Sequence, residues 1–348
     1  MITTQELAKL AGVSQSTVSR SLSNSSRISV ETRVRVQELA KEYGYNMKKK
    51  KSRTTHSIIN NGGIVVIIGA DKLKCPLELY LEYLLNEMVM QIEMQNYYPV
   101  VLPYDASEES FKYIQSVIET DDIKGVVIIY HEFQSTLEEY LSSFDMPHVY
   151  TQYFARDKKK TLNIIDVDHF TGGVIAANHL LSLGHQRIGT FTHYGSDFDE
   201  RTAGFIAALK NNGIDHDPEW IIKSGNSYAT AYEAIDKNWK KIEDCTAFFA
   251  QTDLVGIAAI NYLVDRGYQV PQQYSVIGFD GLHEGTFCRP QLTTVIQPVN
   301  IIAESSMNRL VYLINQDDTS ASHFFIQPQL CVRTSTGEAR TSTGEARK

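Results

Sequence analysis

Two hydrophobic patterns divide the chain. Within the first 45 residues, apolar side chains recur at intervals of three and four, as they do on the buried face of short helices. From Gly63 onward, short β-branched runs alternate with amphipathic stretches, a pattern typical of strands followed by helices. Because 348 residues exceed what one core usually supports, we expect a small helical head joined to a larger α/β body.

The head is predicted to form three short helices. A capping box, Thr3-x-x-Glu6, begins the first helix, Gly12 ends it, and its apolar face is formed by Leu7, Ala8, Leu10 and Ala11. Ser14 is a candidate N-cap for the second helix, which places Val18 and Leu22 on one face. Ser29 is a candidate cap for the third helix, whose inner face is formed by Thr32, Val36, Leu39, Ala40 and Tyr43.

The first two of these helices suggest a DNA-binding arrangement. A helix, a tight turn at Gly12 and a second helix follow one another in the order of a helix-turn-helix. In that motif the second helix enters the major groove. Its polar face contains Gln15, Ser16, Ser19 and Arg20. Hydroxyl groups suit phosphate oxygens, whereas glutamine and arginine can read base edges. The alternative, a flexible serine-rich linker, does not explain apolar residues at helical spacing.

The distribution of charge supports this interpretation. Residues 1–60 contain eleven Lys and Arg against four Asp and Glu, a net +7, whereas the remaining residues contain 22 against 37, a net −15. A basic head on an acidic body favours nucleic acid as a partner of the head only. The joint that follows, residues 46–63, includes a basic run suited to phosphates, Lys48, Lys49, Lys50, Lys51 and Arg53. A solvated linker is the alternative, and such a segment can also become ordered on DNA.

The body is predicted to contain parallel sheets covered by helices on both faces. Strands are expected at residues 64–69, 100–103, 125–130, 148–151, 164–168, 187–192, 247–253 and 275–280, with helices such as 77–94, 170–183 and 254–266 between them. So many units favour two α/β lobes, with a ligand cleft at the carboxyl ends of the strands. Side chains that suit a sugar follow these strands: Phe170, Arg201, Asp253 and Asp280. Taken alone, an Asp there more often caps a helix, and Phe170 more often belongs to a core.

Composition excludes several classes of protein. No window reaches the run of about 20 apolar residues that a membrane helix needs, and the amino terminus lacks the pattern of a secretory signal. The four cysteines lie far apart, which suggests reduced thiols and no zinc site. Phosphate-binding, dinucleotide-binding and hydrolase motifs are missing. We therefore expect a cytoplasmic protein that has no contact with membranes, is not an enzyme, and carries no cofactor and no metal.

Residues 3–45 resemble the headpiece of the lactose/galactose repressor family. The matching positions are Leu7, Ala8, Ala11, Gly12, Val13, Ser14, Thr17, Val18, Ser19, Arg20, Leu22, Ser29, Thr32, Arg33, Gly44 and Tyr45. The resemblance implies that Gln15, Ser16 and Arg20 read bases. It implies contacts to the DNA backbone by Thr17, Ser19, Asn24 and Arg33, and Thr4 is included in the DNA-binding set. The family's hinge pattern P-N-x-x-A-R-x-L is absent, which leaves a minor-groove wedge in doubt.

The body resembles the sugar-binding fold of periplasmic proteins that these repressors carry. Five blocks match it: residues 179–191, 196–205, 247–253, 270–280 and 292–298. By position, Arg201 and Asp280 would hold hydroxyl groups of an effector, with help from Asp253 and Gln297. Four further residues complete the predicted effector site: Pro76, Leu77, His169 and Phe170. One departure from the family is Thr252, which stands where an asparagine is usual.

The resemblance implies a headpiece over residues 1–46, a basic hinge over 47–62 and a core over 63–337. Lobe one is expected at about 63–163 and 292–325, and lobe two at about 164–291 and 326–337. Residues 341–347 repeat residues 334–340, and residues 338–348 are expected to be a tail without a role in the fold. No leucine heptad follows, so a homodimer is expected, with each head reading half of an operator.

The resemblance thus predicts a repressor of sugar-utilisation genes that binds double-stranded operator DNA under the control of a small sugar. Two alternatives of different kinds remain at this point. One keeps the fold but replaces the sugar with a phosphorylated carrier protein, as in catabolite control. The other is an α/β enzyme with a regulatory head.

Overall fold

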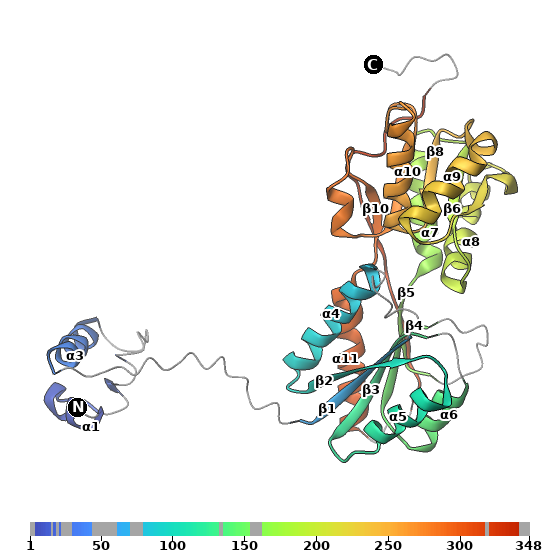
Figure 1. Cartoon of the computed structure of the whole chain (residues 1–348). Coiled ribbons are helices and arrows are strands. Elements are labelled where there is room, and N and C mark those ends of the chain that lie inside the picture. Colours follow the sequence, from blue (N-terminus) through green and yellow to red (C-terminus); the bar gives the residue numbers. More distant parts are fainter. Residues whose placement is uncertain are drawn as a thin grey trace. The chain divides into compact units, whose positions relative to one another are not determined.

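The structure is a computed structural model that describes residues 4–14, 17–18, 21, 30–43, 61–69, 79–131, 135–153, 162–316 and 320–340. Two compact units are present, residues 1–58 and residues 59–348. The first unit is the helical head, and the second contains two α/β lobes with one six-stranded sheet each (Figure 1).

Helices α1 (Thr4–Ala11) and α3 (Val30–Glu42) form the head together with a helical segment that includes Thr17, Val18 and Ser21. Its core is a small cluster of buried aliphatic side chains, Leu7, Ala8, Ala11, Val18, Val36 and Ala40. The predicted N-cap is confirmed, because the Ser14 hydroxyl accepts a hydrogen bond from the Thr17 amide at 3.1 Å. The head thus has the helical packing that its periodicity predicts.

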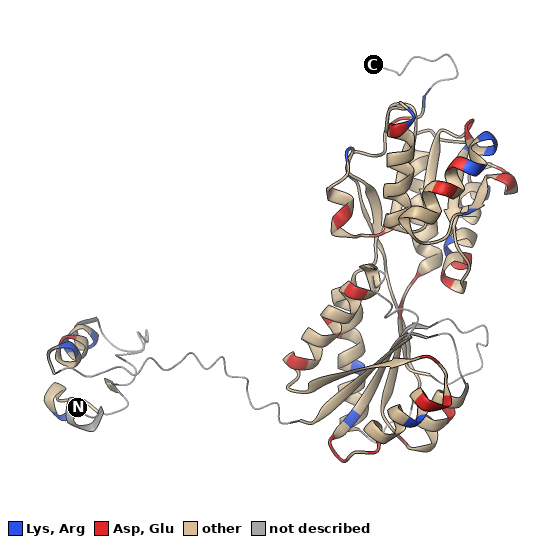
Figure 2. Cartoon of the chain, viewed as in Figure 1, with Lys and Arg blue, Asp and Glu red and all other residues tan. Residues whose placement is uncertain are grey.

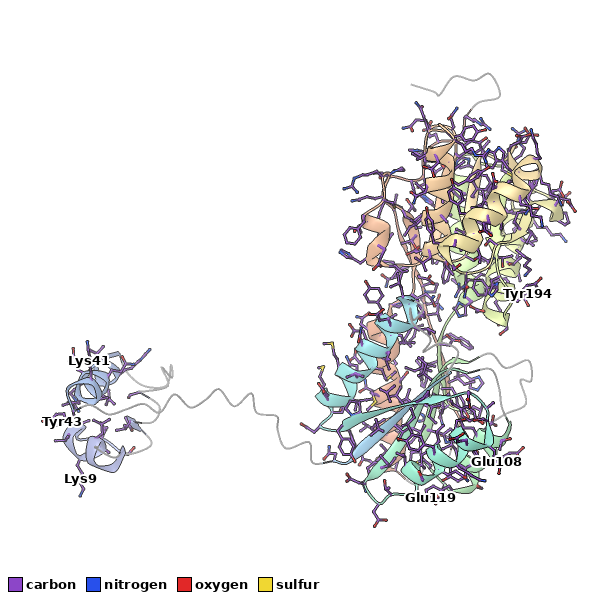
Figure 3. All side chains as sticks on the ribbon, in the orientation of Figure 1. Lys9, Lys41, Tyr43, Glu108, Glu119 and Tyr194 are labelled. Carbon is purple, nitrogen blue, oxygen red and sulfur yellow. The ribbon has the colours of Figure 1, made fainter. Side chains whose placement is uncertain are left out.

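Two residues assigned to the buried faces of the head lie on its surface instead. Leu10 and Tyr43 are each 48% exposed. Helix α1 buries Leu7, Ala8 and Ala11, and a turn of about 100° per residue places Leu10 beyond the edge of that face. Tyr43 follows the last residue of α3, where the chain no longer lies over the core, and it projects outward with Lys9 and Lys41 (Figure 3).

The sheet of the first lobe has the strand order β11-β5-β4-β3-β1-β2. Every pairing within it is parallel. The strands are β1 (Gly63–Gly69), β2 (Tyr98–Tyr104), β3 (Ile123–His131), β4 (His148–Tyr153), β5 (Ile164–Val167) and β11 (His323–Ile326). The helices are α4 (Leu79–Met94), α5 (Glu108–Ile118), α6 (Ser135–Ser143) and α11 (Val299–Asn315).

Both faces of this sheet are covered, which explains its continuously apolar strands. On β1, Ile64 and Val66 pack toward α4 and α11, whereas Val65 and Ile67 pack toward α5 and α6 (Figure 1). Side chains alternate along a strand, so burial of both faces requires an apolar residue at every position. The predicted parallel sheet covered by helices is confirmed for this lobe.

The sheet of the second lobe has the order β12-β10-β9-β8-β6-β7. It is parallel except for the pairing of β12 with β10. Its strands are β6 (Ile188–Thr192), β7 (Ile221–Lys223), β8 (Ala247–Ala250), β9 (Ser275–Asp280), β10 (Thr293–Ile296) and β12 (Gln329–Cys331). The main helices are α7 (His169–Ser182), α8 (Ser196–Asn211), α9 (Tyr228–Ile242) and α10 (Asp253–Asp265), and two short 3₁₀ turns are η1 (Pro218–Trp220) and η2 (His283–Thr286).

The chain crosses between the lobes a few residues later than the sequence suggested. Strand β5 completes the first sheet, so the first crossing follows residue 167 and does not lie near 163. Strand β10 pairs with β9 in the second sheet, so the second crossing follows residue 296 and does not lie near 292. The last crossing connects β11 and β12. Each strand finishes its ladder of hydrogen bonds before the chain leaves its sheet.

The segment after β12 is part of the second lobe. The Ser335 hydroxyl is fully buried, donates to the Val276 carbonyl and accepts from the Thr293 amide. The Ala339 amide donates to the Leu183 carbonyl at 2.8 Å. The expected tail therefore still packs on the lobe at residues 338–340, and the repeated segment from 341 lies outside the described residues.

Candidate functional site

A cavity of about 50 Å³ lies at the carboxyl ends of the strands of the second lobe, where the amino-terminal end of α4 from the first lobe faces them. Its lining residues are Leu79, Tyr80, Leu81, Asp197, Phe198, Arg201, Asn226, Thr252, Leu254, Asp280, Leu282 and Gln297. A neighbouring hollow of about 280 Å³ shares four of them, Tyr80, Asp280, Leu282 and Gln297. This is the predicted position for a ligand in such sheets.

Arg201, on α8, is held in place by contacts within the second lobe. Its side chain is 2% exposed, Nε donates to His169 Nδ1 at 3.2 Å, and Nη1 donates to the Gln251 carbonyl at 2.6 Å. Nη2 lies 3.4 Å from Asp197 Oδ2, one helical turn earlier. The guanidinium also lies over the Phe279 ring, 4.0 Å from its centroid. The cation is therefore already neutralised and oriented before any ligand binds.

Asp280 and Gln297 form a buried hydrogen-bonded pair that faces both hollows. Gln297 Nε2 donates to Asp280 Oδ1 at 2.8 Å. This contact fixes the orientation of the amide, because the opposite orientation would place two acceptors against each other. Asp280 ends β9 with φ at +125°, a conformation that costs energy for a residue with a side chain. Such strain at the end of a strand often accompanies a binding function.

The amide oxygen of Gln297, Oε1, has no hydrogen-bond partner in the described part of the chain. Gln297 is 2% exposed, and among the described residues no group forms a hydrogen bond with its Oε1. A buried acceptor without a donor costs about 1–3 kcal/mol, and Gln297 lines the cavity, so a ligand that supplied a donor would relieve that cost. Gln297 is thus the clearest sign of a ligand site in the second unit.

Asp253 does not face the cavity, although its two neighbours Thr252 and Leu254 do. Its carboxylate accepts hydrogen bonds from the amides of Gly281 and Leu282 at 2.9 and 2.6 Å and from the Thr294 hydroxyl at 2.6 Å. Burial and the nearby Asp280 raise the pKa of Asp253 well above its ordinary value, and the hydrogen bonds oppose that rise. Asp253 therefore shapes the loop after β9, and the departure from the family, Thr252, caps α10 through the Val255 amide.

Two other predicted effector residues also lie outside the lining. His169 is buried behind Arg201, with Nε2 3.7 Å from Asp166 Oδ1. Phe170, expected as an aromatic platform, is 44% exposed and lines neither hollow. It occupies the outward side of the first turn of α7, because the side of α7 that packs on α8 is formed by glycine and alanine. Pro76 and Leu77 lie outside the described residues.

The sequence reasoning missed Tyr80, the polar residue that the first lobe contributes to both hollows. Burial raises the pKa of its phenol well above 10, and the carboxylates of Asp166 and Asp280 raise it further. The hydroxyl is therefore a neutral donor that faces acidic groups across the cleft. No local signal marks Tyr80, whereas Asp197 could have been found from its position four residues before Arg201 on a predicted helix.

Comparisons with known proteins identify the family. Residues 3–47 match the family model of bacterial regulatory proteins, lacI family, and residues 177–336 match a periplasmic binding protein-like domain. The chain belongs to the LacI family of transcriptional regulators. The family and its relatives regulate transcription and are not enzymes, which confirms that expectation.

Its relatives match over nearly their whole length. The transcriptional repressor PurR of Mannheimia succiniciproducens is 26% identical, over 96% of this chain and 98% of that protein. The regulator MalR of Clostridium butyricum is 28% identical, over 95% of this chain and 98% of that protein. Among solved structures, a complex of the transcriptional regulator CelR with cellobiose has a TM-score of 0.71 at 24% identity and covers 96% of this chain and 100% of that one. A LacI-family regulator from Enterococcus faecium with bound ribose has a TM-score of 0.69 at 22% identity, over 80% and 100%.

In this LacI-family regulator the predicted DNA-contacting residues are only partly described. Thr17 lies in the helical segment of the head, and Arg33 is half-buried on α3. The remaining members of the set lie outside the described residues, as does the side chain of Thr4: Gln15, Ser16, Ser19, Arg20, Asn24, Lys48, Lys49, Lys50, Lys51 and Arg53. Acidic side chains are spread over both lobes of the other unit (Figure 2).

Two further properties concern only the described part of the regulator. None of its helices there combines the length and the apolar character that a membrane span requires. No group of three or more His, Cys, Asp or Glu side chains in these segments is arranged to hold a metal ion.

Proposed function

We propose that this LacI-family regulator represses sugar-utilisation genes, that it acts in the cytoplasm as a homodimer on operator DNA, and that a small sugar between its lobes controls its DNA affinity. The homodimer is favoured because one helix-turn-helix reads only half of a near-palindromic site. The sugar is supported by the polar cavity and by the solved relatives that hold cellobiose and ribose.

The observation that carries the effector site is the unpartnered Gln297 Oε1. A sugar hydroxyl would donate to it, and neighbouring hydroxyls would reach Asp280 and the guanidinium of Arg201. Phe198 and Tyr80 would provide aromatic surface for the C–H groups of the ring. Asp253, His169 and Phe170 would then act only through the residues that they position.

Movement of the lobes would let a ligand enter the small cavity. The cavity of about 50 Å³ holds only a few water molecules, and the neighbouring hollow of about 280 Å³ shares Tyr80, Asp280, Leu282 and Gln297 with it. Three crossings connect the lobes, so a sugar can separate and reorient them about these segments. A sugar changes DNA affinity only if it binds the two lobe arrangements with different affinity.

On the DNA side, Gln15, Ser16 and Arg20 would read base edges. Contacts with the DNA backbone and phosphates would come from Thr4, Thr17, Ser19, Asn24, Arg33, Lys48, Lys49, Lys50, Lys51 and Arg53. The test begins with selection of the preferred duplex from a random pool by the full chain. Arg20→Ala should then bind the selected and the random duplex equally well. Lys41→Ala removes the same charge from an exposed position of α3 and should keep the preference.

The effector is tested on the same protein–operator complex. A panel of sugars is screened for those that raise the thermal stability of the protein, since a ligand that binds only the folded state stabilises it. A sugar found in this way should change operator affinity in the native chain and have no effect in Asp280→Asn. Asp199→Asn, an exposed change on α8, is the matched control. A response retained by Asp280→Asn would contradict the site.

A further inference from the structure

The charges around the cavity point to a more specific ligand class. Two carboxylates, Asp197 and Asp280, line it, and Arg201 is the only cation among its described lining residues. A third carboxylate, Asp166, lies behind the lining, where it raises the pKa of the Tyr80 phenol. The electrostatic field that a ligand meets is therefore negative.

Arg201 does not offset this field for an incoming anion. Two of its N–H groups donate to His169 Nδ1 and the Gln251 carbonyl, and Nη2 forms an ion pair with Asp197. Its positive charge is compensated by Asp197 at 3.4 Å, in a site where both side chains are less than a tenth exposed. An arginine that recognises a phosphate or a carboxylate instead presents two parallel N–H groups to it.

The cavity contains donors, such as the Tyr80 hydroxyl, but its charged acceptors, Asp197 and Asp280, outnumber the one cation among its described lining residues. Gln297 Oε1 has no partner among the described residues, and the carboxylates of Asp280 and Asp197 can each accept further hydrogen bonds. A ligand satisfies Gln297 Oε1 and the two carboxylates only by donating. Hydroxyl and amino groups donate, whereas ionised phosphate and carboxylate groups only accept.

Building on the proposed function, we propose that the effector of this regulator is a donor-rich sugar without an anionic group, and that sugar phosphates and sugar acids are rejected at the same site. The rejection comes mainly from Asp280, because the one cation of the described cavity lining, Arg201, is already paired with Asp197, and Arg333 of the neighbouring hollow donates to the Leu292 carbonyl. Placing like charges together in a buried site weakens binding strongly, on the order of tenfold or more for each close pair.

The first test is a matched ligand panel on the full chain. Glucose, ribose, cellobiose and glucosamine are compared with glucose 6-phosphate, ribose 5-phosphate and glucuronate by thermal shift at constant ionic strength. We expect one or more of the four compounds without an anionic group to stabilise the chain, and none of the three anionic compounds to do so. Stabilisation by an anionic member at equal or lower concentration would overturn this inference and leave the proposed function in place. If no member stabilised a chain that still bound its operator, both would be overturned.

The second test changes the charge of the cavity. In Asp197→Asn, Arg201 loses its ionic partner, so inorganic phosphate should bind about tenfold more tightly than to the native chain. Asp199→Asn removes an exposed charge two residues away and should show no gain. If Asp197→Asn fails to fold, phosphate affinity is measured in Asp280→Asn, which lacks the other lining carboxylate and should show the same gain. Equal phosphate affinity in the native chain and in either folded cavity variant would contradict the role of these carboxylates.

Discussion

Replacing Gln297 with methionine should separate ligand binding from folding. Methionine has a similar length and volume but neither donates a hydrogen bond nor strongly accepts one. The change removes two features that have opposite effects on the free energy of unfolding. It removes the donor to Asp280 Oδ1, a contact of 2.8 Å, and it also removes the buried Oε1 that has no partner among the described residues.

The two contributions should nearly cancel in the ligand-free protein. A hydrogen bond to a carboxylate contributes about 1.5–3 kcal/mol, and relief of an unpartnered buried acceptor returns about 1–3 kcal/mol. Because Asp280 faces both hollows, water can replace part of the missing donor. We therefore expect the free energy of unfolding to change by less than about 1 kcal/mol.

Sugar affinity should fall in the same variant. A sugar hydroxyl that meets methionine in place of Oε1 loses its acceptor, which costs about 1–3 kcal/mol. That loss corresponds to a dissociation constant about 5- to 150-fold larger. Calorimetric titration with the sugar that stabilises the native chain measures this ratio, and urea unfolding of the ligand-free protein measures stability.

Gln251→Met is the matched control, because Gln251 is the other buried glutamine of this region. Its Oε1 accepts from Thr192 at 2.8 Å and its Nε2 donates to Thr202 at 2.7 Å, and it lines neither hollow. This variant should lose about 1–3 kcal/mol of stability and keep its sugar affinity if it remains folded. The reasoning is refuted if Gln297→Met is the variant that loses stability, or if it binds the sugar as well as the native chain does.

Four other changes test the remaining interactions. Arg201→Ala leaves the buried Asp197 unpaired and should lower the free energy of unfolding by about 3–5 kcal/mol, with partial recovery on adding Asp197→Asn; an unchanged urea midpoint would contradict this. Gly204→Ala places Cβ 1.9 Å from the Phe170 carbonyl and should lower stability by at least about 2 kcal/mol. Gly213→Ala, whose Cβ meets nothing within 4 Å, should cost less, because its only penalty is the strain of φ at +75°. Burial lowers the pKa of His185 from 6.5 to about 4. The stability that the neutral imidazole contributes is therefore complete above pH 6.5 and is lost as the pH falls toward 4, by up to about 3 kcal/mol. His185→Asn should show a smaller fall in the free energy of unfolding over that range. Replacing Lys48–Lys51 with alanine should reduce the salt slope of operator binding by about 0.9 for each phosphate that is no longer neutralised, and an unchanged slope would identify the run as a tether only.

The sequence by itself determined most elements of this protein, because helical and strand periodicities are local. Val18 is buried and Ser14 caps the segment that contains it, as the spacing in the head predicted. The apolar runs predicted β1–β6, β8 and β9 but missed β7, β10, β11 and β12. The family follows from motifs at fixed offsets. Asp280, Arg201 and Gln297 were identified as ligand residues, and all three line the cavity.

Only the tertiary structure decided which way several side chains face and which sheet a strand joins. Asp253 and Phe170 lie at the start of helices, as Asp280 lies at the end of a strand, yet Asp253 turns into the lobe and Phe170 toward solvent. Tyr80 reaches the cavity from the opposite lobe, more than 100 residues away from Asp197 in the chain. Local patterns fix the periodicity of an element but not its rotation or its neighbours, since both depend on packing between segments that are distant in sequence.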